Sequence, residues 1–298
     1  MGHEHHHHHE VTGKNLFWTI LLNAGISLAE LIGGIIAGSM ALISDAIHNF
    51  SDVISLIVSY IANRLSKKAA NEKQTFGYKR SEIIAAFLNS TTLIILAIFI
   101  LYEAVQRILH PHPIKSDLVI WLALGSIAVN GLSVLFIKED AKDNINMKSA
   151  YLHLFGDMMT SIAVLIGGIV MKYYHIYWID PLFSILIAIY LIYMSWDIFK
   201  TSLKIMMQFT PENLDLKRIA KDIEQIDGVK NIHHIHTWQI NEHDVMFEAH
   251  LDVDKDCRIT DFEDIMKKVN AYLKEHYEIE HTTLQPEFSI KDDKKLIH

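Results

Sequence analysis

Two histidine–aspartate pairs, each spaced four residues apart, lie in the middle of apolar segments. His48 and Asp52 form the first pair, and His153 and Asp157 form the second. On a helix, residues four apart project from one face, one turn apart. Two such faces brought together would offer two imidazoles and two carboxylates, a tetrahedral ligand set suited to Zn²⁺. The repeated spacing predicts one shared metal site; the alternative is two structural polar clusters between helices.

The first pair belongs to an apolar run, residues 40–61, that is long enough to cross a bilayer. The ten Leu, Ile, Val and Phe residues of this run favour insertion by roughly 3–6 kcal/mol, and Asp45 and Asp52 oppose it by about 5–7 kcal/mol. Because these terms nearly cancel, we expect the helix to be stable only in a bundle whose interior receives its polar groups. Asp45 lies one turn from His48, where we expect it to line the approach to the site.

Six apolar segments before residue 209 have the length of a membrane-spanning helix. The connections after the second and fourth segments carry nine lysines and arginines, whereas those on the opposite side carry three. The positive-inside rule therefore places the richer connections, and both termini, in the cytoplasm. We expect no cleavable signal peptide before the first segment. We expect a multi-pass protein of the cell (inner) membrane, with spans at residues 16–37, 40–62, 83–102, 118–137, 150–171 and 179–199.

The composition limits the other classes of protein. The chain has 298 residues, of which 50% are hydrophobic, and a net charge of −8. Without a basic excess, nucleic-acid binding has no electrostatic basis. The single cysteine, Cys257, excludes an internal disulfide and a thiolate-rich zinc site. Residues 1–14 form a histidine-rich tail whose composition favours metal collection in the cytosol, with an expression tag as the alternative.

The last part of the chain, residues 210–298, predicts a small soluble α/β domain after the six-helix transport domain of residues 15–209. Thr210 resembles a helix N-cap followed by proline, so we expect a helix from there to about residue 226. Alternating apolar and polar residues then predict strands. The expected order is αββαβ, an open sandwich with one uncovered sheet face, with strands at 229–239, 244–253 and 282–290 and a second helix at 261–277.

Three residues of this domain are candidates for a cytosolic metal site. His233 and His250 are expected on adjacent strands, and Glu287 on a strand that could flank them. Imidazole and carboxylate groups are both zinc ligands. In a regular strand His233 and His236 would face opposite ways, so we expect only one of them to join the site.

The chain resembles the cation diffusion facilitators, a family of proton-coupled exporters of divalent metals. The resemblance covers nearly everything after the histidine-rich tail. It rests on residues 42–52 (LISDAIHNFSD), 76–82 (FGYKRSE), 153–157 (HLFGD), 180–184 (DPLFS) and 281–287 (HTTLQPE).

This resemblance implies a homodimer in the lipid bilayer, with transport ligands on the second and fifth helices and a metallochaperone-like cytosolic domain. The connection after the second helix lacks the His and Asp ligands of some members, so we expect no extra surface site there. The connection at residues 138–149 is too short for the histidine-rich loop of others. The implied ligands are His48, Asp52, His153 and Asp157 for transport, and His233, His250 and Glu287 in the cytosol, with His281 as a further candidate.

We expect the protein to exchange cytoplasmic Zn²⁺ for protons. Metal ligands must lose their protons, so Zn²⁺ and protons compete for the same side chains, and histidine titrates near neutral pH. Zn²⁺ is thus expected both as transported substrate and as regulatory ligand, and no catalytic residue is expected. Two alternatives remain at this point: an intramembrane zinc metalloenzyme with Asp45 as its base, and a membrane-anchored zinc sensor.

Overall fold

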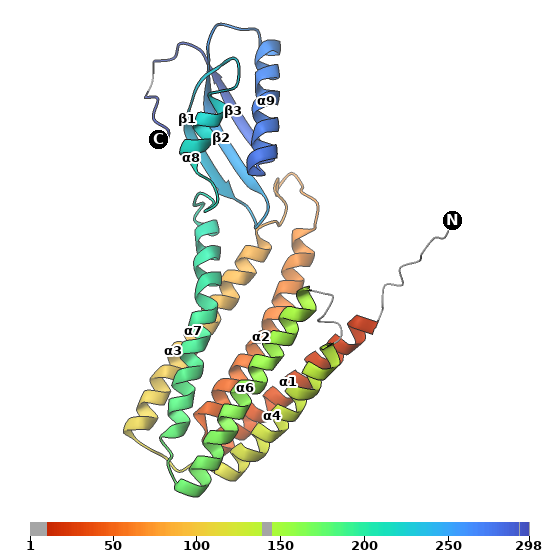
Figure 1. Ribbon diagram of the computed structural model, residues 1–298, viewed down its shortest axis with the longest axis vertical. Coiled ribbons are helices and arrows are strands. Elements are labelled where there is room, and N and C mark those ends of the chain that lie inside the picture. The colour runs from red at the N-terminus through yellow and green to blue at the C-terminus, as the bar shows by residue number, and fades with distance from the viewer. Residues whose placement is uncertain (1–10, 139–144, 292, 298) are drawn as a thin grey trace, which may run out of the picture. The chain divides into compact units, whose positions relative to one another are not determined.

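A computed structural model describes residues 11–138, 145–291 and 293–297 of the chain (Figure 1). The predicted histidine-rich tail lies mostly outside the described residues, as do residues 139–144 of the fourth connection. Five described helices are long and apolar enough to cross a membrane, and the apolar part of α1, Leu21–Ala37, is shorter. The membrane helices are α1 (Val11–Ala37), α2 (Met40–Ser66), α3 (Ser81–Leu109), α4 (Ser116–Ile137), α6 (Ile145–Tyr174) and α7 (Ile179–Met206).

The chain forms two compact units: residues 1–58 with 88–197, and residues 59–87 with 198–298. In the first unit all six membrane helices contribute small or aliphatic side chains to one core. The outward surfaces of these helices are also apolar, as shown by the exposed side chains of Ile98, Leu135 and Ile189. An extended apolar surface of this kind is typical of a protein embedded in lipid. The predicted helical membrane domain is therefore confirmed.

Two glycines fix the tight junction between α1 and α2. Gly38 follows the last residue of α1 with a φ of +74°, the left-handed conformation that favours glycine at a helix C-terminus. Gly34 lies against α2, since a Cβ at this position would lie 2.8 Å from Cγ1 and 3.1 Å from the backbone nitrogen of Ile43. The absence of a side chain at Gly34 therefore allows α2 to start close to α1.

The first turn of α2 is capped by a side chain from α7. The Asp180 carboxylate accepts hydrogen bonds from the Ser39 hydroxyl at 2.5 Å and from the Met40 N–H at 2.7 Å. The free N–H groups of a helix start are favourable partners for an anion. Because Asp180 and Ser39 are both buried, these bonds are shielded from water. They fix the start of α2 about two turns before His48.

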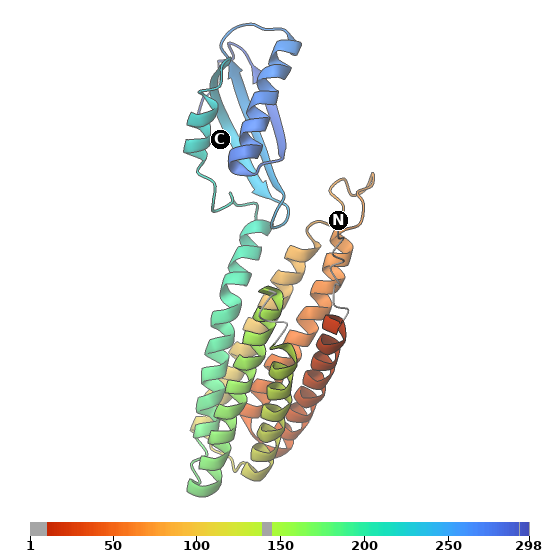
Figure 2. The same ribbon diagram turned by 45° about the vertical axis from the view of Figure 1, so that its right-hand side comes forward.

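The soluble part of the second unit has the predicted αββαβ order. The strand order is β1-β2-β3, with β1 and β2 antiparallel and β2 and β3 parallel. Helices α8 and α9 cover one face of this sheet (Figure 2), where Phe247, Ala249 and Leu251 are buried. The elements are α8 (Leu216–Ile223), β1 (Val229–Gln239), β2 (Val245–Val253), α9 (Ile259–Tyr277) and β3 (His281–Glu287).

The predicted start of the first helix of this domain is wrong. Helix α8 begins at Leu216, and its N-cap is Asp215, whose carboxylate accepts hydrogen bonds from the N–H groups of Lys217 at 3.0 Å and Arg218 at 3.3 Å. Pro211 instead belongs to a preceding turn, in which its carbonyl accepts the N–H of Leu214. A carboxylate that reaches two free N–H groups caps more effectively than the Thr–Pro pattern further upstream.

The sheet face opposite the helices is largely uncovered, as predicted, and Glu248 and Gln285 are exposed there. The C-terminal segment runs beside β1, where its carbonyls at Lys295 and Leu296 accept the N–H groups of His234 and Ile235. His233 and Glu287, at one end of this face, are buried.

We expect Gly34→Ala to destabilise the membrane unit by about 1–2 kcal/mol, since the added methyl overpacks the contact with Ile43. Gly25→Ala is the matched control in the same helix, because a Cβ there meets no described atom within 4 Å. It should be neutral or raise stability by up to about 1 kcal/mol through helix propensity. Thermal unfolding of the purified protein in detergent measures both. Equal melting temperatures for the two variants would contradict the close contact.

Candidate metal centres

The first candidate centre joins α2 to α6 in the membrane unit. His153 Nε2 lies 3.2 Å from Asp52 Oδ2, and His48 Nε2 lies 3.5 Å from Asp157 Oδ1. Within each helix, His48 Nδ1 lies 3.5 Å from Asp52 Oδ2, and His153 Nε2 lies 3.7 Å from Asp157 Oδ2. Each imidazole therefore lies between the two carboxylates. The structure brings together all four residues that the sequence predicted.

These spacings are compatible with a zinc ligand set. Bonds of about 2.0–2.2 Å to a tetrahedral zinc ion place neighbouring ligand atoms roughly 3.3–3.6 Å apart. In the described part of the chain, however, the sets of three donors that all lie within 4.8 Å of one another are in the soluble domain. The four membrane side chains are thus arranged as a ring of pairs. To bind one ion, the four side chains must rotate towards a common centre.

Exposure is uneven around the ring. The His153 side chain is 47% exposed, whereas the Asp157 side chain one turn further along α6 is 6% exposed. On α2, Asp52 is likewise more exposed than His48. His153 lies nearer the N-terminus of α6 than Asp157 does, and Asp52 lies nearer the C-terminus of α2 than His48 does. The ring is therefore open on one side and closed on the other.

Asp45 fixes the two ligand-bearing helices to each other. It is fully buried, and its carboxylate accepts hydrogen bonds from Thr160 Oγ1 at 2.9 Å and Ser161 Oγ at 3.2 Å, both on α6. Asp45 thus joins α2 to α6 on the closed side of the ring, and its place along the approach to the site stays a prediction. The sequence reasoning missed Thr160 and Ser161. Their position three and four residues after Asp157 could have indicated that they share its helix face.

The second candidate centre lies on the sheet of the soluble domain. His250 Nδ1 lies 2.6 Å from Glu287 Oε1, and His233 Nε2 lies 3.3 Å from Glu287 Oε2. The three residues predicted for a cytosolic site therefore come together. His281 does not join them, because it pairs with Met246, four residues along β2 from His250 and thus roughly 13 Å away.

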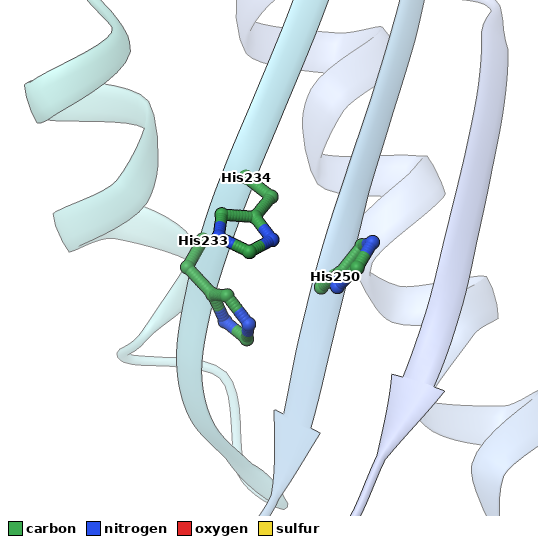
Figure 3. Close-up of side chains that lie close together, drawn as sticks. All are labelled: His233, His234 and His250. Carbon is green, nitrogen blue, oxygen red and sulfur yellow. The ribbon is translucent and has the colours of Figure 1, made fainter. Parts of the chain in front are cut away.

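Two further residues, His234 and Asp252, complete this centre. The described donors form two overlapping sets, His233–His234–His250 and His233–Asp252–Glu287. Figure 3 shows His233 and His234 on β1 and His250 on the neighbouring strand β2. Asp252 could have been found from the sequence, because it is on the same face of β2 as His250 and is paired with Glu287.

His234 could not have been found from strand alternation, because β1 is not regular. The register between β1 and β2 shifts between His233 and His236, and His234 has a φ of +49°. This bulge places two consecutive histidines next to His250. It also overturns the prediction that His233 and His236 face opposite ways. His236 shares the face of His233, but it is exposed, pairs with Glu248 and lies outside both donor sets.

A bundle of apolar helices with a histidine–aspartate ring in its interior, followed by a soluble domain with a second ligand cluster, defines a membrane transporter of metal cations. A comparison with known protein families supports this class. Residues 16–207 match the cation efflux transmembrane domain, and residues 211–289 match the cytoplasmic domain of cation efflux proteins. The chain belongs to the cation efflux family, as the sequence motifs predicted. It is a multi-pass membrane transporter with a cytoplasmic C-terminal domain, and the metalloenzyme alternative is wrong.

Several characterised relatives are similar along almost their whole length. The chain is 37% identical to the cadmium, cobalt and zinc/H(+)-K(+) antiporter of Bacillus subtilis, over 96% of this chain and 92% of the relative. It is 33% identical to the zinc transporter ZitB of Pectobacterium atrosepticum, over 98% and 91%. It is 30% identical to the metal cation efflux system protein CzcD of Cupriavidus metallidurans, over 96% and 89%.

We expect Asp45→Ala to lower the stability of the membrane unit by about 1.5–3 kcal/mol, because it removes hydrogen bonds between a carboxylate and two hydroxyls of α6. Ser44→Ala is the matched control: Ser44 is also buried, but its hydroxyl donates within α2, to the carbonyl of Met40. Thermal unfolding in detergent compares the two. A melting temperature for Asp45→Ala no lower than that of Ser44→Ala would show that Asp45 does not hold α2 against α6.

Proposed function

We propose that this protein exports Zn²⁺ from the cytoplasm in exchange for protons, with His48, Asp52, His153 and Asp157 as the transport ligands. The observation that carries the proposal is the position of each imidazole between two carboxylates supplied by two different helices. The relatives named as zinc transporters and as a zinc/H(+)-K(+) antiporter support zinc as substrate and protons as coupling ions.

The ring of side chains provides a means of coupling the two ions. A protonated imidazole is attracted to the carboxylates on both sides of it, whereas Zn²⁺ requires deprotonated imidazoles. The ring therefore takes up either protons or the metal, and histidine makes this choice near neutral pH. The nearly neutral cytoplasm favours loading of Zn²⁺, and a more acidic exterior favours its release. Alternate exposure of the ring to the two sides then exchanges the ions.

The uneven exposure of the ring supports loading from the cytoplasm. Helix α7 leads into the cytoplasmic domain, so α6 starts, and α2 ends, on the cytoplasmic side. The more exposed ligands, His153 and Asp52, are those nearer this side. We propose that both termini are cytoplasmic and that the protein resides in the cell (inner) membrane. In this division, residues 1–14 are a metal-collecting tail, 15–209 the transport domain and 210–298 the regulatory domain.

The ligand types favour zinc and its neighbours. Imidazole with carboxylate suits Zn²⁺, Co²⁺ and related ions, whereas carboxylates alone suit Mn²⁺. Cadmium and cobalt appear with zinc in the name of the Bacillus relative, so both are proposed as secondary substrates.

We further propose that the cytosolic cluster binds a regulatory Zn²⁺ through His233, His250 and Glu287. The cluster fits this ion by its donor chemistry, since imidazole and carboxylate are zinc ligands, and by the convergence of its donors within 4.8 Å. Asp252 and His234 offer further donors. Bound there, the metal would link β1, β2 and β3. The resemblance to the cation diffusion facilitators also implies that the protein acts as a homodimer.

Proteoliposomes test the transport proposal. Zn²⁺ should enter vesicles with an acidic interior, and collapsing the pH gradient should slow it severalfold. Asp157→Ala should reduce the initial rate at least about tenfold, because loss of a ligand should cost no less than loss of a ligand's hydrogen-bonding partner, which typically costs about 10–100-fold. His112→Ala is the control, since this exposed histidine lies in the loop between α3 and α4. Mn²⁺ should enter poorly. Zinc flux that ignores the pH gradient would refute the coupling.

A further inference from the structure

A lysine from the C-terminal segment reaches into the cytosolic cluster. The ammonium nitrogen of Lys294 lies 2.9 Å from Glu287 Oε2, 3.0 Å from Asp252 Oδ2 and 3.3 Å from His233 Nε2. These three residues are the members of the buried donor set. The ammonium group thus contacts at least one donor atom of every residue in that set, which is the position that a metal ion would take.

The buried acids of this cluster need a cation nearby. The side chains of Asp252 and Glu287 are 9% and 3% exposed. Burying carboxylates without a compensating charge or hydrogen bond is strongly unfavourable. Lys294 supplies both, since its ammonium group donates hydrogen bonds to the two acids.

The backbone around Lys294 is fixed to the same part of the sheet. The N–H of His234 donates to the Lys295 carbonyl at 3.0 Å, and the N–H of Ile235 donates to the Leu296 carbonyl at 2.8 Å. Because β1 is an edge strand, the segment pairs with its free edge. The Leu296 side chain also packs partly against the domain core. One attachment therefore involves His234, itself a candidate ligand.

The ammonium group and a metal ion cannot occupy this set together. Lysine donates at hydrogen-bond distances of about 2.7–3.2 Å, whereas zinc bonds are about 2.0–2.2 Å long. Both cations require the same lone pairs of Asp252 and Glu287. An ion bound to these donors would also lie next to the positive charge of Lys294, and like charges at such a distance repel each other.

We propose that Lys294 is a tethered competitor for the cytosolic metal site, and that metal binding expels its side chain and releases the C-terminal segment from β1. The inference rests on the proposed cytosolic site. The lysine raises the metal concentration needed to fill this site, because metal binds only to the fraction of molecules from which the ammonium group has left. Filling the site also changes which backbone groups of β1 are free for another contact.

The test compares three variants of the full-length protein in detergent. Zinc affinity is measured by competition with a chromophoric chelator. Each variant is measured with and without His250→Ala, and the zinc binding lost with His250→Ala is assigned to the cytosolic site. Lys294→Gln should raise the zinc affinity of the cytosolic site at least about tenfold if the lysine occupies the site in nine of ten molecules. Lys294→Arg retains a cation and should bind more weakly than Lys294→Gln. Lys295→Gln is the control, because Lys295 is exposed and pairs with Asp293.

Hydrogen exchange provides the second readout. Zinc should accelerate exchange of the Ile235 amide at least severalfold in the parent protein, because its acceptor on Leu296 leaves. If His250→Ala removes no zinc binding from any variant, the cytosolic site itself is wrong and the lysine proposal fails with it. If His250→Ala removes zinc binding but Lys294→Gln leaves that affinity unchanged or weaker, the site stands and the competition by Lys294 is overturned.

Discussion

The structure of the membrane unit depends on compensating buried charge between α2 and α6. A carboxylate in the middle of a bilayer is stable only with a partner, and His48 and His153 each lie between Asp52 and Asp157. The helices must therefore stay within a few ångströms of each other. Hydrogen bonds from α6 to Asp45 hold this distance on the closed side of the ring. The same pairing that stabilises the bundle creates the site at which we propose that metal and protons compete.

The supports of α2 come from three other helices. Gly34 of α1 allows close approach, Asp180 of α7 caps the first turn, and the Asp45 contacts join it to α6. None of these groups belongs to the ring, yet each limits how far α2 can move without breaking a buried contact. A transporter must change the exposure of its site, so its moving parts have to be rigid elements whose contacts have discrete alternatives. Helix α2 meets the requirement of rigidity through short, buried hydrogen bonds near its N-terminus.

The cytosolic cluster solves the same electrostatic problem in a different way. In the membrane, imidazoles lie between the acids, and protons can supply the positive charge. In the soluble domain, the ammonium group of Lys294 lies against Asp252 and Glu287. Protons arrive from the solution, whereas a lysine side chain is part of the chain and brings its backbone with it. The membrane site is thereby suited to exchange between two compartments, and the cytosolic site to a change in the chain itself.

The sequence alone determined the six apolar helices, the αββαβ order and the four candidate membrane ligands, because each depends on a pattern within one segment: apolar length for a span, alternation for a strand, and four-residue spacing for a helix face. Tertiary structure decided the rest. The bulge at His234 breaks the alternation of β1 and adds a candidate ligand, and Asp45 turns out to be a contact between helices. Lys294 reaches its place because the chain end pairs with β1, sixty residues earlier in the sequence. Such contacts depend on which distant segments meet, and local patterns carry no record of that.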